Sequence, residues 1–116
     1  MATIKSYSDL EQSRKLADIL PLESADMGYL WNGTSFCDYP VSNQTIFNRI
    51  ENIPCWSLAS LLGVLPLVDF TTPQLIGTPK TLYRCIYNDN LKSHAYDNPV
   101  DACVAMIEKL HELNFL

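Results

Sequence analysis

The sequence has 116 residues, of which 47% are hydrophobic, and its formal net charge at pH 7 is −5. The length suits a single domain spanning 1–116, and the apolar fraction is high enough for a core, which excludes wholesale disorder. The acidic balance argues against nucleic acid as a partner, because phosphate binding needs a clustered basic face.

The chain shows no sign of export or of a membrane span. Residues 1–9 lack a basic segment followed by an apolar one. The most apolar run, 53–70, contains Pro54 and Pro66 and is a poor spanning helix. We therefore expect a cytoplasmic protein that does not enter a membrane. Its four cysteines are expected to be reduced and mostly buried; they are Cys37, Cys55, Cys85 and Cys103.

A helix is expected over residues 8–20. Ser8 and Glu11 fit a capping box, and Pro21 ends the helix. Its apolar face would contain Leu10, Leu16, Ala17 and Leu20.

An extended segment is expected next, over residues 27–31, followed by a turn at Asn32-Gly33. A second short strand over 35–39 would pair back onto the first. Residues 40–52 fit either a loop or a helix whose face contains Ile46, Phe47 and Ile50.

Residues 54–65 are expected to form a short helix, with Pro54 in its first turn and leucines on one face. A β-hairpin follows, with one arm near 74–77 and the other over 81–88. In the second arm Tyr83, Cys85 and Tyr87 would share one face.

The C-terminal helix has the strongest signals. Asn98 is a good N-cap, Pro99 fits the first position, and Asp101 favours the positive end of the helix. The buried stripe would comprise Val100, Cys103, Val104, Ile107 and Leu110. Together the elements predict an α+β fold, in which a small antiparallel sheet of three to four strands packs with about three helices.

Three segments carry a family resemblance. They are residues 13–27, the stretch Ile53-Pro54-Cys55-Trp56-Ser57-Leu58 with its continuation to Pro66, and Asp97-Asn98-Pro99-Val100-Asp101-Ala102 with its continuation to Leu113. The sequence resembles a family of short uncharacterised proteins from gut anaerobic bacteria, often encoded in phage-like or other mobile DNA. The resemblance covers a little under half of the chain, and it implies a shared fold but no activity, cofactor or site residue.

Few residues point to chemistry. Cys55 would lie at a helix N-terminus, where a thiol pKa is lowered, and His94 or His111 could act as its base. No thiol-enzyme signature surrounds Cys55, and a buried thiol beside Trp56 is the favoured interpretation. No pair of closely spaced metal ligands is present, and neither a metal nor a cofactor is expected. Carboxylates four residues apart, such as Asp97 and Asp101, are typical of solvated helix faces.

Aromatic residues offer the best binding candidates. Tyr29, Trp31, Tyr83 and Tyr87 could lie on one sheet face, which would be core if a helix covers it and a binding surface if it is open. The sequence favours a non-enzymatic accessory protein that contacts a protein partner or associates with itself. A small-ligand-binding module and a thiol-dependent enzyme centred on Cys55 are the alternatives.

Overall fold

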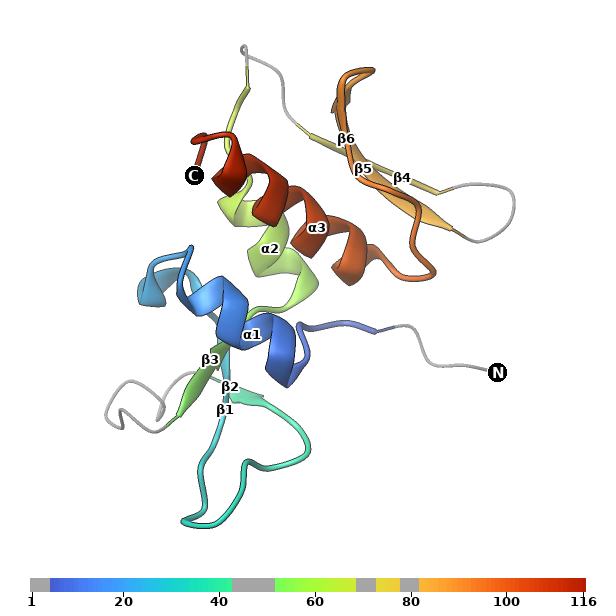
Figure 1. Ribbon diagram of the computed structural model, residues 1–116. Helices are drawn as coiled ribbons and strands as arrows, with labels where there is room; N and C mark the ends of the chain where they lie inside the picture. Colours follow the sequence, from blue (N-terminus) through green and yellow to red (C-terminus); the bar gives the residue numbers. More distant parts are fainter. Residues whose placement is uncertain (1–4, 43–51, 69–72, 78–81) are drawn as a thin grey trace.

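Figure 1 shows the chain as a computed structural model, which describes residues 5–42, 52–68, 73–77 and 82–116. Over these residues the chain forms three α-helices and two antiparallel sheets of three strands each, so the predicted α+β class is confirmed. In chain order the elements are α1 (Leu10–Ala17), the 3-10 helix η1 (Leu22–Ser24), β1 (Met27–Tyr29), β2 (Val41–Ser42), β3 (Ile53–Cys55), α2 (Leu58–Val64), β4 (Gln74–Gly77), β5 (Tyr83–Asn88), β6 (Leu91–Lys92) and α3 (Pro99–Glu112).

Helix α3 is the centre of the core. It lies between α2 and the sheet β4-β5-β6 (Figure 1). The Asn98 side chain caps it by accepting a hydrogen bond from the Asp101 N–H at 2.8 Å, and Pro99 occupies the first turn. Each residue of the predicted stripe is buried, with 3% or less of its surface exposed. The C-terminal helix is therefore confirmed, because its caps and its apolar spacing agree.

The hairpin of β4 and β5 is also confirmed. Leu75 pairs with Cys85, and Gln74 with Ile86. Cys85 and Tyr87 are buried in the core that contains α3, whereas Ile86 is only partly buried. Strand β6 extends this sheet after a β-bulge between Ile86 and Asn88. The predicted turn and the first residue of the second arm lie outside the described residues.

Helix α1 begins later than predicted. Asp9, not Ser8, is its N-cap, and the capping box joins Asp9 to Gln12. Ser8 is fully buried and bonds elsewhere. The helix also ends earlier, at Ala17, which is exposed, although Leu16 and Leu20 do enter the core.

The turn after β1 is confirmed, but its predicted partner strand is not. Trp31 and Phe36 form an isolated bridge across the turn. Strand β1 pairs instead with β2 on one side and β3 on the other. The undecided residues Ile46, Phe47 and Ile50 lie outside the described residues.

The predicted helix over 54–65 is wrong in its first part. Ile53–Cys55 is strand β3, and helix α2 starts only at Leu58, with Ser57 as its N-cap. Pro54, opposite Gly28, stands in the middle of the strand. Among the described residues β3 lies at the edge of its sheet, and an edge strand tolerates a proline because one side of it needs no N–H donors.

Candidate functional site

Residues 30–40, here called the arm, form a hairpin that projects from the body of the molecule (Figure 1). Asn32 closes its turn, because its side-chain oxygen accepts hydrogen bonds from the N–H groups of Thr34 at 3.0 Å and Ser35 at 2.9 Å. Gly33 has a φ of 102°, which an L residue with a side chain rarely adopts. The Cys37 N–H donates to the Leu30 carbonyl oxygen at 3.0 Å. Local bonds thus give the arm a defined shape.

Aromatic side chains are concentrated in the arm. The rings of Trp31 and Phe36 meet edge to face, with centroids 5.0 Å apart. The Arg14 guanidinium lies 5.4 Å from the centroid of the Phe36 ring, within the range of a cation–π contact. Tyr39 is 74% exposed. None of these side chains is part of the main hydrophobic core of the described residues.

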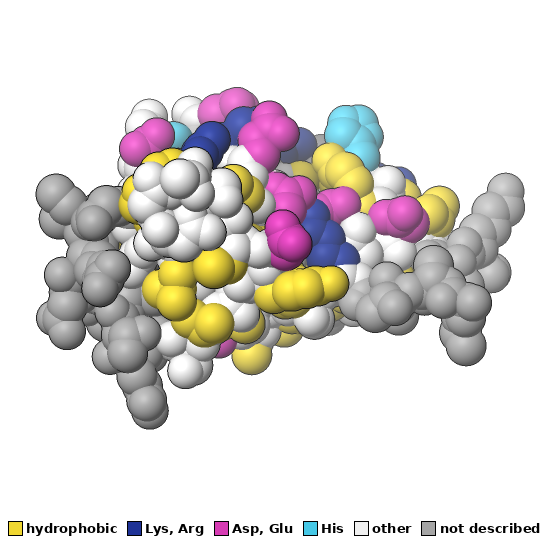
Figure 2. Space-filling view, turned by 90° about the horizontal axis from the view of Figure 1, so that it is seen from below, with side chains coloured by type: hydrophobic (Ala, Val, Ile, Leu, Met, Phe, Trp, Pro, Cys, Tyr) yellow, Lys and Arg dark blue, Asp and Glu magenta, His cyan; other side chains and the backbone are white. Residues whose placement is uncertain are grey.

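The arm projects towards the face seen in Figure 2. This view shows hydrophobic side chains grouped together, beside a region where acidic and basic side chains gather. Val41, directly after the arm in β2, is 39% exposed. Aromatic and arginine side chains at such a surface are the residue types that dominate the energy of protein–protein interfaces.

The structure does not bring the four predicted aromatic residues onto one sheet face. Tyr29 belongs to the sheet β2-β1-β3, whereas Tyr83 and Tyr87 belong to β5 of the other sheet. Trp31 lies in the arm. Tyr83 is partly buried and packs against the core. The four residues do not share one face because the chain forms two sheets instead of one. A binding role for these residues stays a prediction.

Tyr29 and Tyr87 serve the core. Tyr29 is 4% exposed and its hydroxyl donates to the Ser8 carbonyl oxygen at 2.9 Å. Tyr87 is 6% exposed and its hydroxyl donates to the Pro66 carbonyl oxygen at 2.6 Å. Burial raises the pKa of both phenols, that of Tyr87 to about 12. Both therefore stay protonated and keep these hydrogen bonds at neutral pH.

The expected place of Cys55 at a helix N-terminus, on which its predicted reactivity depended, is wrong. The residue lies in β3, not at a helix N-terminus, and its surface is 0% exposed. Its thiol donates to the Ser8 carbonyl oxygen at 3.3 Å, and burial raises its pKa. No imidazole serves it as a base: His94 is exposed, and His111 Nδ1 lies 3.0 Å from the Leu116 carbonyl oxygen. A nucleophilic thiol needs a lowered pKa and access to solvent, and Cys55 has neither.

The Asp97 and Asp101 pair belongs to a polar cluster at the start of α3. Asp101 accepts hydrogen bonds from Lys5 at 3.0 Å, from Gln12 at 2.7 Å and from Asn98 at 2.8 Å. Burial alone would raise the pKa of Asp101, but these hydrogen bonds outweigh it and lower the pKa. A carboxyl with a lowered pKa is a poor general acid, and the bond from Gln12 to Asp101 joins α1 to α3.

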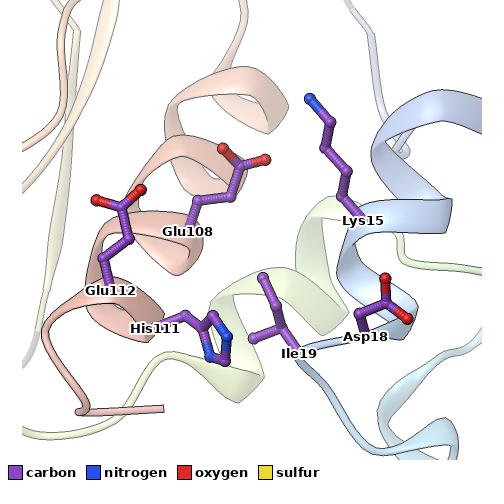
Figure 3. A pocket seen from close by; sticks show the side chains of 6 residues that line it. All are labelled: Lys15, Asp18, Ile19, Glu108, His111 and Glu112. Atoms are coloured by element: carbon purple, nitrogen blue, oxygen red, sulfur yellow. The ribbon is translucent and has the colours of Figure 1, made fainter.

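A hollow of ≈ 400 Å³ lies between α1 and the C-terminal half of α3 (Figure 3). It is lined by Lys15, Asp18, Ile19, Glu108, His111 and Glu112. Within the described part of the chain, none of the four charged side chains around it has a hydrogen-bond or ion-pair partner. The volume reaches the size expected of a ligand site, but a lining with one aliphatic residue is unlike the mainly apolar pockets that hold small molecules.

A second hollow, of ≈ 320 Å³, lies on the other side of Glu108 and Glu112 and is also bordered by Lys92 and His94. Across residues 5–42, 52–68, 73–77 and 82–116, no group of three or more His, Cys, Asp or Glu side chains could hold a metal ion. The same residues contain no helix with the length and apolar character needed to cross a membrane.

Sequence reasoning missed Arg14, Phe36 and Tyr39 as surface candidates. A signal was present, because Trp31, Phe36 and Tyr39 lie close together around an Asn-Gly turn that cannot itself be buried. The fold and the arm define a small α+β protein with an exposed aromatic hairpin. Comparison of the sequence with known protein families, with curated proteins and with solved structures finds no match.

Proposed function

We propose that this chain is a non-enzymatic, cytoplasmic accessory protein that binds a protein partner through its arm. The observation that carries the proposal is a set of aromatic side chains held outside the main core, with Tyr39 74% exposed. An aromatic side chain that does not contribute to the core gains its free energy of burial only when another molecule covers it.

The arm is also preorganised for binding. Its turn is closed by Asn32, and the ring of Phe36 contacts both the Trp31 ring and the guanidinium of Arg14. A surface that is ordered before binding loses less conformational entropy when the complex forms. We expect Tyr39 and Trp31 to enter apolar hollows of the partner, and Arg14 to meet an acidic group at their rim.

The resemblance to short proteins encoded in mobile DNA of gut anaerobes supports an accessory role, and we extend the proposal to a phage or mobile-element origin. The partner is then a protein of the host cell or of the element itself, with a second copy of this chain as the alternative occupant. The arm argument is the same for both, so the experiment must distinguish them.

Site-specific photo-crosslinking tests the proposal. A photoreactive phenylalanine analogue at position 39 is expected to capture one discrete partner in cells, whereas the same analogue at Phe115, which is 50% exposed, captures none. Mass spectrometry of the product separates a second copy of this chain from another protein. Equal labelling from both positions, or no product from position 39, would contradict the proposal.

Tyr39→Ala gives the matching affinity test once the partner is isolated. The substitution should weaken binding by about 2 kcal/mol or more, which is about 30-fold, because exposed tyrosines at interface centres are frequent hot spots. It should change the free energy of unfolding by less than about 0.5 kcal/mol, because Tyr39 lies outside the core. Leu67→Ala, at a residue 62% exposed, is the control that should leave affinity unchanged.

A second candidate is a small cationic ligand in the hollow between α1 and α3. The ≈ 400 Å³ volume favours it, and so do the acidic side chains of Asp18, Glu108 and Glu112, which have no ion-pair partner among the described residues. An NMR titration with a short aliphatic diamine should shift the resonances of His111 and Glu108 saturably. Glu108→Gln should abolish the shift, and Asp97→Asn, outside the hollow, should not. A linear, unsaturable change would remove this candidate.

A further inference from the structure

Strand β4 lies at the edge of the sheet β4-β5-β6. Within the described residues it pairs with β5 on one side, and no strand pairs with its outer side. Helix α3 packs against one face of this sheet (Figure 1). Leu75 packs against the core, whereas its neighbour Ile76 is 40% exposed. The outer edge of β4 is therefore available to another strand.

Hydrogen bonds of β5 show how the backbone of this sheet is oriented. Tyr83 exchanges both of its backbone hydrogen bonds with Tyr96, at 2.6 and 2.8 Å. The Cys85 carbonyl oxygen accepts the Ser93 N–H at 2.9 Å. The backbone groups of Tyr83 and Cys85 thus point to the side where β6 lies. Because successive residues of a strand direct these groups to opposite sides, those of Arg84, between them, point towards β4.

The register of β4 then identifies the groups at its outer edge. Ile76 is paired with Arg84, so the N–H and C=O groups of Ile76 face β5. The corresponding groups of Leu75 and Gly77 point away from β5, to the outer side of the sheet. An added strand would therefore form its hydrogen bonds with Leu75 and Gly77, while the exposed side chain of Ile76 lies between them.

The opposite edge of the same sheet is protected. Strand β6 contains only Leu91–Lys92, and Lys92 is exposed. The Lys109 Nζ donates a hydrogen bond to the Lys92 carbonyl oxygen at 3.2 Å. Short edge strands and exposed lysines keep further strands from adding. The segment 70–79, which contains β4, has no charged residue, so the two edges of the sheet differ in how they receive another strand.

The sequence around β4 is symmetric about Ile76. Pro73 stands three positions before it and Pro79 three positions after it. A proline has no N–H and cannot donate to a strand ladder. If two copies of this segment align antiparallel on Ile76, both therefore run out of donors at the same sequence positions. This match suits a strand that pairs with its own copy, and pairing with another protein would not require it.

We propose that two copies of this chain associate through β4, about a twofold axis at Ile76, and join their sheets into one. Leu75 of each copy exchanges both backbone hydrogen bonds with Gly77 of the other copy. The two Ile76 residues face each other across the axis as a pair without mutual hydrogen bonds, with Cα atoms about 4.5 Å apart. Each chain has a net charge of −5, and contact through an uncharged segment limits the repulsion between two acidic chains. This interface is separate from the arm.

Sedimentation equilibrium tests the association. A short pair of strands buries less than the roughly 1,200 Å² of a standard interface, so the dimer should be weak and should form between about 1 μM and about 1 mM protein. Ile76→Lys and Ile76→Glu should each weaken it by about tenfold or more, because like charges then face each other at the axis. An equimolar mixture of the two variants should dimerise again, because the facing charges are opposite.

Two variants control for charge and for the arm. Leu62→Lys adds the same charge at another residue that is 40% exposed, and it should leave the dimer unchanged. Tyr39→Ala should also leave it unchanged, so a failure of this proposal can be told apart from a failure of partner binding by the arm. A dimer that Tyr39→Ala abolishes and Ile76→Lys preserves would assign self-association to the arm and overturn the proposal.

Hydrogen exchange of the unmodified protein provides a second test that needs no substitution at the strand. The Leu75 amide should exchange more slowly as the protein concentration rises, because it is bonded only in the dimer. The Ile76 amide, which faces β5, should be protected at every concentration. The proposal is overturned if the chain stays monomeric over the whole range, if the mixture of charged variants does not dimerise, or if exchange at Leu75 is independent of concentration.

Discussion

Ser8 is the most informative position for testing how the N-terminal part of the fold is held. Its hydroxyl oxygen accepts the Trp56 N–H at 3.1 Å and is 2.7 Å from the Ser13 hydroxyl oxygen. Ser8 and Ser13 are both 0% exposed. The Ser8 backbone also bonds to Trp56, since its N–H donates to the Trp56 carbonyl oxygen at 2.9 Å. One side chain therefore satisfies polar groups of α1 and of the segment between β3 and α2.

Ser8→Ala removes three hydrogen bonds at once, which join the Ser8 hydroxyl to the Trp56 N–H, the Ser13 hydroxyl and, at 3.5 Å, the Cys55 sulfur. It leaves the Trp56 N–H and the Ser13 hydroxyl without a partner in a site closed to water. A buried polar group that loses its partner costs about 1–3 kcal/mol, so we expect a loss of about 3 kcal/mol in the free energy of unfolding. Ser13→Ala should cost about 1 kcal/mol, because the Ser8 hydroxyl keeps its bond to Trp56.

Asp9, the N-cap of α1, provides the comparison with Ser8. Asp9 accepts a hydrogen bond from the Gln12 N–H at 2.8 Å, and Asp9→Ala should cost about 1 kcal/mol, the usual value of a lost N-cap. If Ser8 were only a cap, as the sequence pattern suggested, Ser8→Ala would cost no more than that. The difference between the Ser8 and Asp9 variants therefore separates a buried polar anchor from a helix cap.

Urea unfolding followed by tryptophan fluorescence and circular dichroism measures these free energies. The double variant Ser8→Ala/Ser13→Ala should be no less stable than Ser8→Ala alone, because removing the Ser13 hydroxyl removes a group that already lacks a partner. The reasoning is refuted if Ser8→Ala costs as little as Asp9→Ala, or if the costs of the two serine substitutions simply add.

Burial raises the pKa of Asp101, but the hydrogen bonds to its carboxylate outweigh burial and keep the pKa below the ordinary 3.8. The ionised carboxylate therefore stabilises the folded protein fully above pH 3.8, and this stabilisation is lost as the pH falls through the folded-state pKa. Asp101→Asn should accordingly flatten the acid limb of a plot of urea midpoint against pH, and an unchanged limb would contradict this. Gly33→Ala should lower the free energy of unfolding by about 1 kcal/mol through backbone strain alone, since no atom lies within 4 Å of the added Cβ. Equal thermal midpoints of the variant and the unchanged protein would argue against the positive φ. Leu61→Ala should lower the free energy of unfolding by about 3 kcal/mol, whereas Leu62→Ala, at a residue 40% exposed, should lower it by less than about 1 kcal/mol. Similar losses of stability for both variants in calorimetry would mean that the buried face of α2 is assigned wrongly.

Elements whose signals are local were predictable. In α3 the cap Asn98, Pro99 and the apolar spacing lie within a few residues of one another, so each could be recognised without knowing the rest of the fold. The hairpin of β4 and β5 likewise depends on alternation within one strand and on a nearby return of the chain. The turn of the arm was predictable because Asn32-Gly33 is a local signal. It was not predictable that residues 35–39 form only an isolated bridge instead of a strand, because that depends on distant parts of the chain.

The sequence by itself determined the α+β class, the C-terminal helix and the turn at Asn32-Gly33, because hydrophobic period, capping and turn signals act over a few residues. Only the tertiary structure decided that Ser8 is buried while Asp9 caps α1, that Pro54 lies in an edge strand, and that Tyr29 and Tyr87 belong to different sheets. It alone placed Cys85 and Cys103 in the same buried core and left Tyr39 outside it. These outcomes depend on which segments compete for the same buried space, and that competition is settled between residues far apart in the chain.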